Sequence, residues 1–328
     1  MATEPSKAEL LALYERMLLI RRMEERLRAD AAAGNLPGAV HLYIGQEAIA
    51  TGVCARLKPT DLITSTHRGH GHFLAKGGEP KAMMAEIWAK RTGICKGMGG
   101  SMHVADFSKG ILGANGIVGG GFAIATGAAL ASNLMHDTRV AVAFFGDGAA
   151  NQGVFMESLN VSSLWKLPLV LVCEHNQFSE FTPSVDITSG DIADRARAFK
   201  IPVSVVDGND VVAVWQAAGE AVEHARRGAG PCFIEAHTYR IQGHLEAEDL
   251  FLAGGKYREK SEIETWRQRD PVERAKQRVA ASGVPEKDLQ ALDARIGETV
   301  EQAVQFARDS EPADPELAFD LMFVGQQA

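Results

Sequence analysis

The sequence of 328 residues predicts an α/β protein with a doubly wound, mainly parallel sheet and helical extensions at both ends. Short apolar segments alternate with helical segments from residue 122 to 245, a pattern typical of βαβ units whose sheet is covered on both faces. Charged amphipathic segments precede and follow this core. We therefore expect a single domain with four parts: a helical part over about 1–92, a glycine-rich loop over 93–121, the core sheet over 122–245 and a helical tail over 246–328.

The N-terminal part begins with a capping box. Ser6 and Glu9 are three residues apart, the spacing at which the side chain of each residue accepts a hydrogen bond from the backbone N–H of the other. A long amphipathic helix should follow and stop near Gly34. A second helix is expected over 81–90.

The loop over 93–121 contains ten glycines in 29 residues. A loop of this length inside a compact domain is more often functional than a spacer, although a mobile linker is the alternative. Apolar residues within it are expected to be buried: Met98, Met102, Ile111, Leu112, Ile117 and Val118.

The core is then expected to alternate regularly. Strands are predicted at 140–145, 169–173, 203–206 and 232–239, separated by helices at 123–134, 154–165, 192–199 and 211–227. The tail should form helices between about 262 and 310, interrupted at Pro271, Gly283 and Pro285.

Composition excludes several classes of protein. Apolar residues make up 46 % and charged residues 23 % of the chain, and its net charge is −8. This balance argues against nucleic-acid binding, which usually needs a basic surface. No run approaches the roughly 18 apolar residues of a membrane span, so we expect a soluble, cytoplasmic protein without a membrane partner. The four cysteines are widely spaced, which indicates neither a zinc site nor a disulfide framework.

One motif carries chemistry of its own. The strand over 140–145 is followed by Gly146-Asp147-Gly148, and the strand over 169–173 is followed by His175 and Asn176. Ligands of open parallel sheets bind beyond the carboxyl ends of the strands, so adjacent strands would bring Asp147 and Asn176 together. Their oxygen atoms suit a Mg²⁺ ion shared with phosphates. The glycines would let backbone approach the ligand, and a helix starting directly after them would offer free N–H groups to an anion.

The same motif resembles a known signature. A GDG followed by 27 residues and then Asn is similar to the thiamine diphosphate-binding motif of the transketolase and 2-oxo acid dehydrogenase families. The dinucleotide fingerprint G-x-G-x-x-G is absent at this place. Eight ordered blocks extend the resemblance to the α subunits of the thiamine diphosphate-dependent component of acetoin and 2-oxo acid dehydrogenase complexes: HLYIGQEA, HRGHG, KGMGGSMH, GANGIVGGG, GDGAANQG, LWKLP, VDGND and YRIQGH. The resemblance implies that this chain forms the diphosphate-binding module of the thiamine diphosphate-binding fold.

The resemblance assigns roles residue by residue. Mg²⁺ would be held by the side chains of Asp147 and Asn176 and by the carbonyl of Phe178. The cofactor would contact the residues His41, His67, Arg68, Gly116, Val118, Asp147, Gly148, Ala149, Asn176, Phe178 and His244. Within this set the diphosphate would be bound by backbone N–H groups of Gly148 and Ala149 and by Arg68 and His244, and the aminopyrimidine by main chain at Gly116 and Val118. His41 would lie near the substrate, and His41 and His244 are the catalytic candidates.

The resemblance also implies the reaction and the partners. It points to an acetoin dehydrogenase that cleaves its small-molecule substrate acetoin and passes a two-carbon unit to a lipoyl-bearing dihydrolipoyl acyltransferase; a pyruvate dehydrogenase α subunit is the alternative. A chain of 328 residues has room for the diphosphate module alone, so a β subunit should complete the site in an α₂β₂ heterotetramer. The β subunit would contact Trp165, Phe155 and the small residues of the helix at 123–134, which are otherwise core.

Other interpretations remain open for parts of the pattern. Histidines 41, 67, 70, 72 and 103, taken singly, are more often structural than functional, and His136 and His224 are expected on helix surfaces. His175 stands where relatives commonly carry Asn and receives no role, and Gln242 is another departure. A nicotinamide-dependent dehydrogenase on a similar sheet and a catalytically silent paralogue are the alternatives from other classes.

Overall fold

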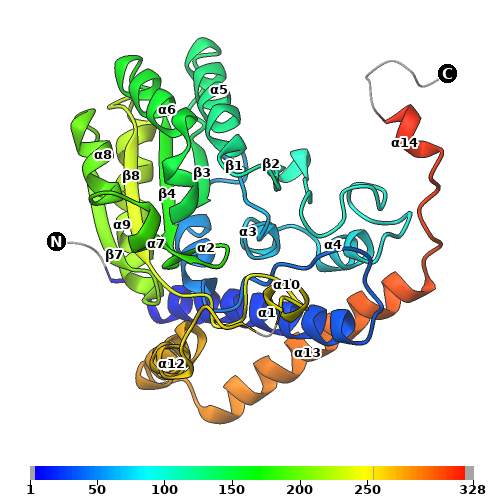
Figure 1. The fold of residues 1–328 in the computed structure, drawn as a ribbon. Helices are drawn as coiled ribbons and strands as arrows, with labels where there is room; N and C mark the ends of the chain where they lie inside the picture. Colours follow the sequence, from blue (N-terminus) through cyan, green and yellow to red (C-terminus); the bar gives the residue numbers. More distant parts are fainter. Residues whose placement is uncertain (1–3, 254, 322–328) are drawn as a thin grey trace.

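A computed structural model describes residues 4–253 and 255–321. Its centre is a six-stranded sheet in which every neighbouring pair of strands is parallel (Figure 1). The strands, in spatial order, are β2 (Ile111–Gly113), β1 (Leu62–Thr64), β3 (Ala141–Gly146), β4 (Leu169–His175), β8 (Cys232–His237) and β7 (Val203–Asp207). The predicted fold class is confirmed. The first residues of the predicted helical part, 1–3, and residues 254 and 322–328 of the predicted tail lie outside the described residues.

Both faces of the sheet are buried because successive side chains of a strand point to opposite faces. In β3, Val142 and Phe144 belong to one apolar cluster, whereas Ala141, Ala143 and Phe145 belong to the other. The first cluster is covered by α2 (Glu47–Cys54), α3 (Gly69–Ala75) and α9 (Val211–Arg226). The second is covered by α5 (Gly120–Leu134), α6 (Gly153–Leu164) and α8 (Ile192–Ala198). The sheet is therefore doubly wound.

The helical extensions pack together although they come from opposite ends of the chain. α1 (Lys7–Ala32) has the predicted capping box of Ser6 and Glu9. It contacts two tail helices, α12 (Pro271–Ala281) and α13 (Glu286–Asp309), and α13 also contacts α4 (Pro80–Ile87) (Figure 1). Arg22 donates to both carboxylate oxygens of Asp293, at 2.9 and 2.8 Å, across the α1–α13 contact. Another tail helix, α11 (Lys260–Arg267), precedes α12.

The glycine-rich loop is held by one buried carboxylate. Glu86, in α4, accepts hydrogen bonds from four backbone N–H groups at 2.7–3.0 Å, those of Cys95, Gly97, Gly99 and Gly100. A charged acceptor with this many donors is strongly stabilised. These bonds tie the first part of the loop, residues 95–100, to α4.

The burial predicted for this loop is only partly right. Ile111 is buried in β2, but Met98, Ile117 and Val118 are 38, 75 and 49 % exposed. The reason is that Ile117 and Val118 line a cavity, so their side chains face its open space and do not pack into the apolar core.

The sequence pattern missed the shortest elements. β1 and β2 have three residues each, too few for periodicity to show, and α2 and α3 lie within motifs that carried no helical signal of their own. The remaining short elements are η1 (Phe107–Lys109), η2 (Asp147–Asn151), β5 (Phe178–Ser179), β6 (Thr182–Pro183), α7 (Ser184–Ile187), α10 (Asp249–Leu252) and α14 (Leu317–Asp320). His136 follows α5 with φ of 54°, so its predicted place on a helix is wrong. Within the described ranges no helix combines the length and apolarity needed to cross a bilayer.

Candidate functional site

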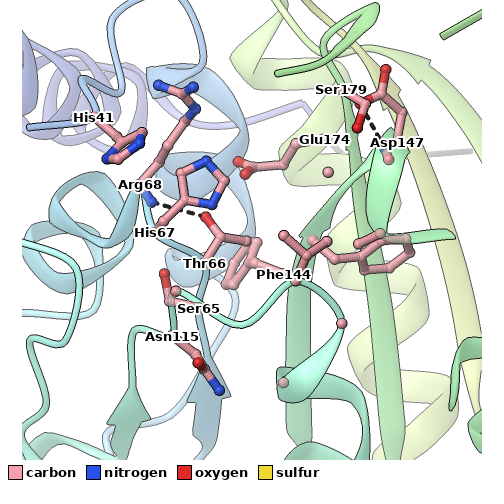
Figure 2. Close-up of a pocket in the computed structure, with 18 of the residues that line it drawn as sticks. His41, Ser65, Thr66, His67, Arg68, Asn115, Phe144, Asp147, Glu174 and Ser179 are labelled. Carbon is pink, nitrogen blue, oxygen red and sulfur yellow. Dashed lines mark hydrogen bonds between the residues drawn. The ribbon is translucent and has the colours of Figure 1, made fainter. Parts of the chain in front are cut away.

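A single cavity at the carboxyl ends of the central strands is lined by every residue that the sequence analysis proposed as catalytic, cofactor-binding or metal-binding. Its empty volume is about 1090 Å³, including the open mouth. The eleven lining residues expected from the sequence are His41, His67, Arg68, Gly116, Val118, Asp147, Gly148, Ala149, Asn176, Phe178 and His244. These residues come from segments up to 203 positions apart, and only the fold brings them together (Figure 2).

Asp147 follows β3 at the floor of the cavity and is 1 % exposed. β3 and β4 are direct neighbours, with Gly146 opposite Glu174, so the expected proximity of Asp147 to the end of β4 is confirmed. Oδ1 of Asp147 accepts from the N–H of Gly148 at 3.0 Å, whereas Oδ2 is buried without a hydrogen-bond partner. Burial raises the pKa of Asp147. A cation at Oδ2 would reverse that direction by stabilising the ionised carboxylate.

Asn176 presents its side chain beside Asp147 and is held from two sides. Its Nδ2 donates to Oε1 of Gln46 at 2.9 Å, which fixes the orientation of the amide, and its Oδ1 accepts a longer bond from the N–H of Phe178 at 3.3 Å. Between them Gln177 has φ of 75°, so the chain turns sharply after β4. Asp147, Asn176 and Phe178 thus line one cavity, and carboxylate, amide and carbonyl oxygens are the ligands that Mg²⁺ takes.

The two glycines of the GDG motif occupy their positions for different physical reasons. A Cβ on Gly146 would meet nothing within 4 Å, which leaves space beside the backbone as expected. A Cβ on Gly148 would overlap the side chain of Ser179, so packing already requires that glycine. The helix predicted at 154–165 is confirmed as α6, which begins at Gly153, but the 3₁₀ turn η2 lies between it and the motif. Gly148 and Ala149 therefore line the cavity from a 3₁₀ turn.

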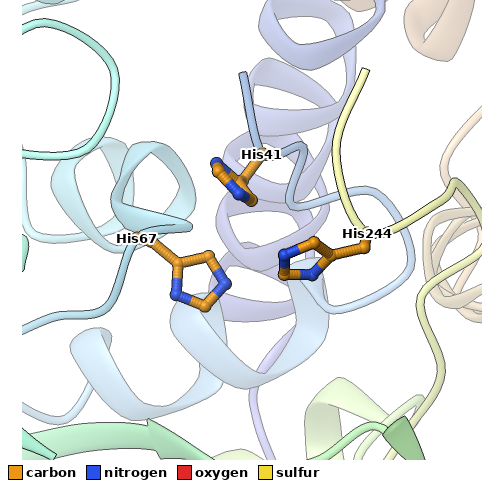
Figure 3. A group of neighbouring side chains, drawn as sticks. All are labelled: His41, His67 and His244. Atoms are coloured by element: carbon orange, nitrogen blue, oxygen red, sulfur yellow. The ribbon is translucent and has the colours of Figure 1, made fainter. Parts of the chain in front are cut away.

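Three histidines meet at the opposite wall of the cavity (Figure 3). The ring centroids of His41 lie 4.8 Å from His67 and 4.9 Å from His244, and those of His67 and His244 are 5.6 Å apart. Burial and the charge of Arg68 lower the pKa of His41 to about 3 and that of His244 to about 2, and lower that of His67 as well. All three rings are neutral near pH 7.

Two arginines determine the tautomer of His244. Nη2 of Arg68 and Nη1 of Arg240 both lie within hydrogen-bond distance of its Nδ1, at 3.1 and 2.9 Å. Guanidinium groups only donate, so Nδ1 must accept and the ring proton must be on Nε2. His244 is therefore a neutral donor through Nε2.

These guanidinium groups carry uncompensated charge. Their other hydrogen bonds go to backbone carbonyls: Arg68 donates to Leu42 and His244, and Arg240 donates to Glu180. Burial and the charge of Arg240 lower the pKa of Arg68 to about 9. Burial also lowers the pKa of Arg240, whose Nε has no partner. Among the described residues neither guanidinium contacts a carboxylate, and two buried cations in this situation favour an anion at this wall.

Sequence reasoning missed Arg240 and Glu174. Arg240 stands in the YRIQGH block directly behind the strand that ends near the cavity, so its position was a usable signal. Glu174, at the end of β4, lines the cavity and is 2 % exposed. It accepts hydrogen bonds from Tyr43 and His72, two residues that no pattern linked to it.

Two further histidines of the HRGHG region are structural, as expected of most histidines. His70 lies between Glu24 and Ser101, at 3.0 Å from each side chain, and joins α1 to the glycine-rich loop. His72 contacts Ser65 at 2.7 Å and stacks on Phe144. His103 contacts the carbonyl of Gly99 outside the cavity lining.

His175, which received no role, contacts charged groups on both sides. Its Nδ1 lies 2.8 Å from Oε1 of Glu235, and its Nε2 lies 3.8 Å from Oδ2 of Asp147. It therefore links the floor of the cavity to β8.

Comparison with known proteins identifies the family of this chain. A family model described as the dehydrogenase E1 component matches residues 15–316. The chain is 48 % identical over 319 residues to the α subunit of acetoin:2,6-dichlorophenolindophenol oxidoreductase of Bacillus subtilis (strain 168), covering 96 % of this chain and 94 % of that protein. The corresponding subunit of Cupriavidus necator is 44 % identical over 313 residues, 94 % of this chain and 92 % of its own length. The pyruvate dehydrogenase E1 component subunit alpha of Rhizobium meliloti (strain 1021) is 41 % identical over 324 residues, 97 % of this chain and 91 % of its own.

Proposed function

Because this chain belongs to the dehydrogenase E1 component family, we propose that it is the α subunit of a thiamine diphosphate-dependent oxidoreductase acting on acetoin. Pyruvate is the alternative substrate, since relatives with that name are 41 and 40 % identical. The acetoin-named relatives, at 48 and 44 %, favour the first assignment.

The observation that carries the proposal is a set of unsatisfied polar atoms in the cavity wall. Oδ2 of Asp147, Nε of Arg240 and Nδ1 of His41 are buried without a partner. Buried polar groups normally find partners, so a ligand that completes these three is expected. It must offer a cation to Asp147 and negative charge to Arg240, which is the combination that Mg²⁺ and a diphosphate provide.

In the proposed arrangement, Asp147, Asn176 and the carbonyl of Phe178 hold Mg²⁺, and Arg68, Arg240 and Nε2–H of His244 hold the diphosphate. Backbone at Gly148 and Ala149 completes the diphosphate site, His67 lies beside it, and backbone at Gly116 and Val118 contacts the aminopyrimidine. Thiamine diphosphate supplies the reactive carbon that cleaves a carbon–carbon bond beside a carbonyl, and the protein supplies orientation and electrostatics. His41, a neutral ring in contact with His67 and His244, is positioned to bond the substrate oxygen.

Charge supports acetoin over pyruvate. Among the described residues that line the cavity, the lysines and arginines are Arg68 and Arg240, and both contact His244. A diphosphate bound there would neutralise both of them. The described residues of the cavity wall then offer no further lysine or arginine to a substrate carboxylate, which suits neutral acetoin.

We also propose that a β subunit completes the site and that the two-carbon product passes to a lipoyl-bearing acyltransferase. An apolar surface on α5 and α6 supports the first part, since Ile124, Leu134, Leu164 and Trp165 are 48, 71, 71 and 52 % exposed. Surfaces of this kind mark interaction sites. Phe155, Ala125 and Ala129 are fully buried in the core, so their expected share in such a contact is wrong.

The test is made on this chain co-expressed with its candidate β subunit. With thiamine diphosphate and Mg²⁺, reduction of an artificial electron acceptor is followed with acetoin, pyruvate and branched 2-oxo acids in parallel. A rate that is highest with acetoin and vanishes without Mg²⁺ supports the proposal. Preference for pyruvate selects the alternative, and a cofactor-independent rate contradicts both.

A further inference from the structure

A second cluster of ligating side chains lies outside this cavity, at the carboxyl ends of β4 and β8. His175 and His237 are register partners on these neighbouring strands, and Glu235 is two residues before His237 on the same face of β8. Nδ1 of His175 and Nε2 of His237 lie 2.8 and 3.2 Å from Oε1 of Glu235. One ligand atom from each of the three residues lies within 4.8 Å of the others.

These distances are close to those of a metal site. In a tetrahedral zinc site with bonds of about 2.0–2.1 Å, neighbouring ligand atoms are separated by roughly 3.3 Å. The two contacts to Glu235 are within about half an ångström of that separation. Two imidazoles and one carboxylate are also a protein ligand set used by zinc, with the fourth position left to water.

The surroundings allow an ion to enter and leave. The three residues line a separate surface cavity together with Asp191 and Arg197, among others. The side chain of Glu235 is 5 % exposed and that of His237 is 41 % exposed, so the carboxylate is fixed inside while one imidazole faces the opening. Oε2 of Glu235 accepts from the N–H of Ala193 at 2.9 Å, which holds the carboxylate in this orientation.

The second ring nitrogen of His175, Nε2, lies near another carboxylate. A metal on Nδ1 requires the ring proton on Nε2, and Nε2 lies 3.8 Å from Oδ2 of Asp147. At this separation the carboxylate makes no hydrogen bond to the ring, but its negative charge favours a cation bound at the other nitrogen.

We propose that His175, Glu235 and His237 bind a divalent transition metal ion, best matched by Zn²⁺, at a site distinct from Asp147 and Asn176. The proposal does not depend on the function proposed above. The competing explanation is a simple ion pair in which both histidines donate to Glu235.

The experiment uses the full chain with its β subunit, stripped of metal and then saturated with Mg²⁺ and thiamine diphosphate. Co²⁺ is titrated in as a spectroscopic probe. One equivalent should bind with the strong visible absorption of a four- or five-coordinate ion bearing nitrogen ligands, and Zn²⁺ should displace it. His237→Gln should weaken Co²⁺ binding at least about 100-fold, because one of three protein ligands is lost.

Controls separate this site from the first. His224→Gln, on α9, removes a histidine outside the cluster and should leave the titration unchanged. Asp147→Ala should retain the Co²⁺ equivalent, weakened by no more than the roughly 10- to 100-fold expected of a group behind a ligand. A weak six-coordinate spectrum, or binding unaffected by His237→Gln, overturns the metal site and leaves the ion pair. If the complex shows no activity with acetoin but still binds Co²⁺ at this site, the function proposed above is contradicted and the metal site is supported.

Discussion

Arg68 donates two hydrogen bonds from Nη2 to His244, one to Nδ1 at 3.1 Å and one to the backbone carbonyl at 2.7 Å, across 176 positions of sequence. This contact ties the loop after β1 to the loop after β8. It also keeps His244 neutral, because a protonated ring could not accept at Nδ1. The charge offered to a ligand at this wall therefore resides on Arg68 and Arg240.

Asp147→Asn should reduce the affinity for thiamine diphosphate in the presence of Mg²⁺ by at least about 100-fold, or roughly 2.7 kcal/mol. The carboxylate is the charged ligand of the proposed Mg²⁺ site, and an amide cannot replace its charge. Isothermal titration of the αβ complex with cofactor and Mg²⁺ measures this. Asp186→Asn, which changes an exposed acid in α7, is the matched control. Equal affinities in the two variants would contradict the assignment of Asp147 as a Mg²⁺ ligand.

Arg240→Lys should weaken thiamine diphosphate at least about 10-fold but leave binding of thiamine without phosphates unchanged. Lysine keeps the charge but loses the fork that bonds Glu180 and His244 at once. Comparing the two ligands on the same variant isolates the phosphate contribution. Arg197→Lys, at an exposed site, should affect neither, and an equal loss for both ligands would show that Arg240 acts through folding.

The cofactor-free chain should lose stability as pH falls from 6.5 towards 3. Burial and Arg68 lower the pKa values of His41 and His244 to about 3 and about 2 in the folded chain, from 6.5. In that window the unfolded chain binds more protons than the folded chain, so unfolding becomes easier as pH drops. Urea unfolding at a series of pH values measures the slope.

The slope has its own controls. His41→Gln should flatten the pH dependence, whereas His136→Gln, at an exposed position, should not. Bound thiamine diphosphate should also flatten it, because a nearby anion favours the protonated rings. A slope that is the same in His41→Gln and in the parent chain contradicts this account.

Glu86→Gln should cost about 3 kcal/mol of unfolding free energy, because four N–H groups lose a charged acceptor at a buried site. The amide would also turn its own NH₂ group towards some of these donors. Urea unfolding gives the free energy, and hydrogen exchange should show faster exchange at residues 95–100. Glu79→Gln, at an exposed position, should change neither the unfolding free energy nor the exchange rates. If the amides at 95–100 stay protected in Glu86→Gln, the conformation of the loop does not depend on this carboxylate.

Most of the core could be predicted from the sequence because its signals are local. The strands at 140–145 and 169–173 are runs of apolar residues, and the helix predicted at 211–227 follows Asp210, whose side chain accepts from the N–H groups of Val212 and Ala213. The residues proposed for the site were found by motif, and Asp147 and Asn176 line one cavity because their strands are neighbours. Arg240 was missed because a single arginine in a loop has no periodicity to mark it.

The sequence alone determined the fold class, the positions of the long elements and the residue types at the strand ends, since each depends on hydrophobic periodicity or on turn and cap chemistry within a few positions. Tertiary structure decided the rest. It chose the sheet order β2-β1-β3-β4-β8-β7, paired α1 with α13, and brought Arg68 to His244 and His175 to Glu235. Such contacts join segments tens to hundreds of residues apart, and no local pattern encodes the distance between two side chains that only the packed core brings together.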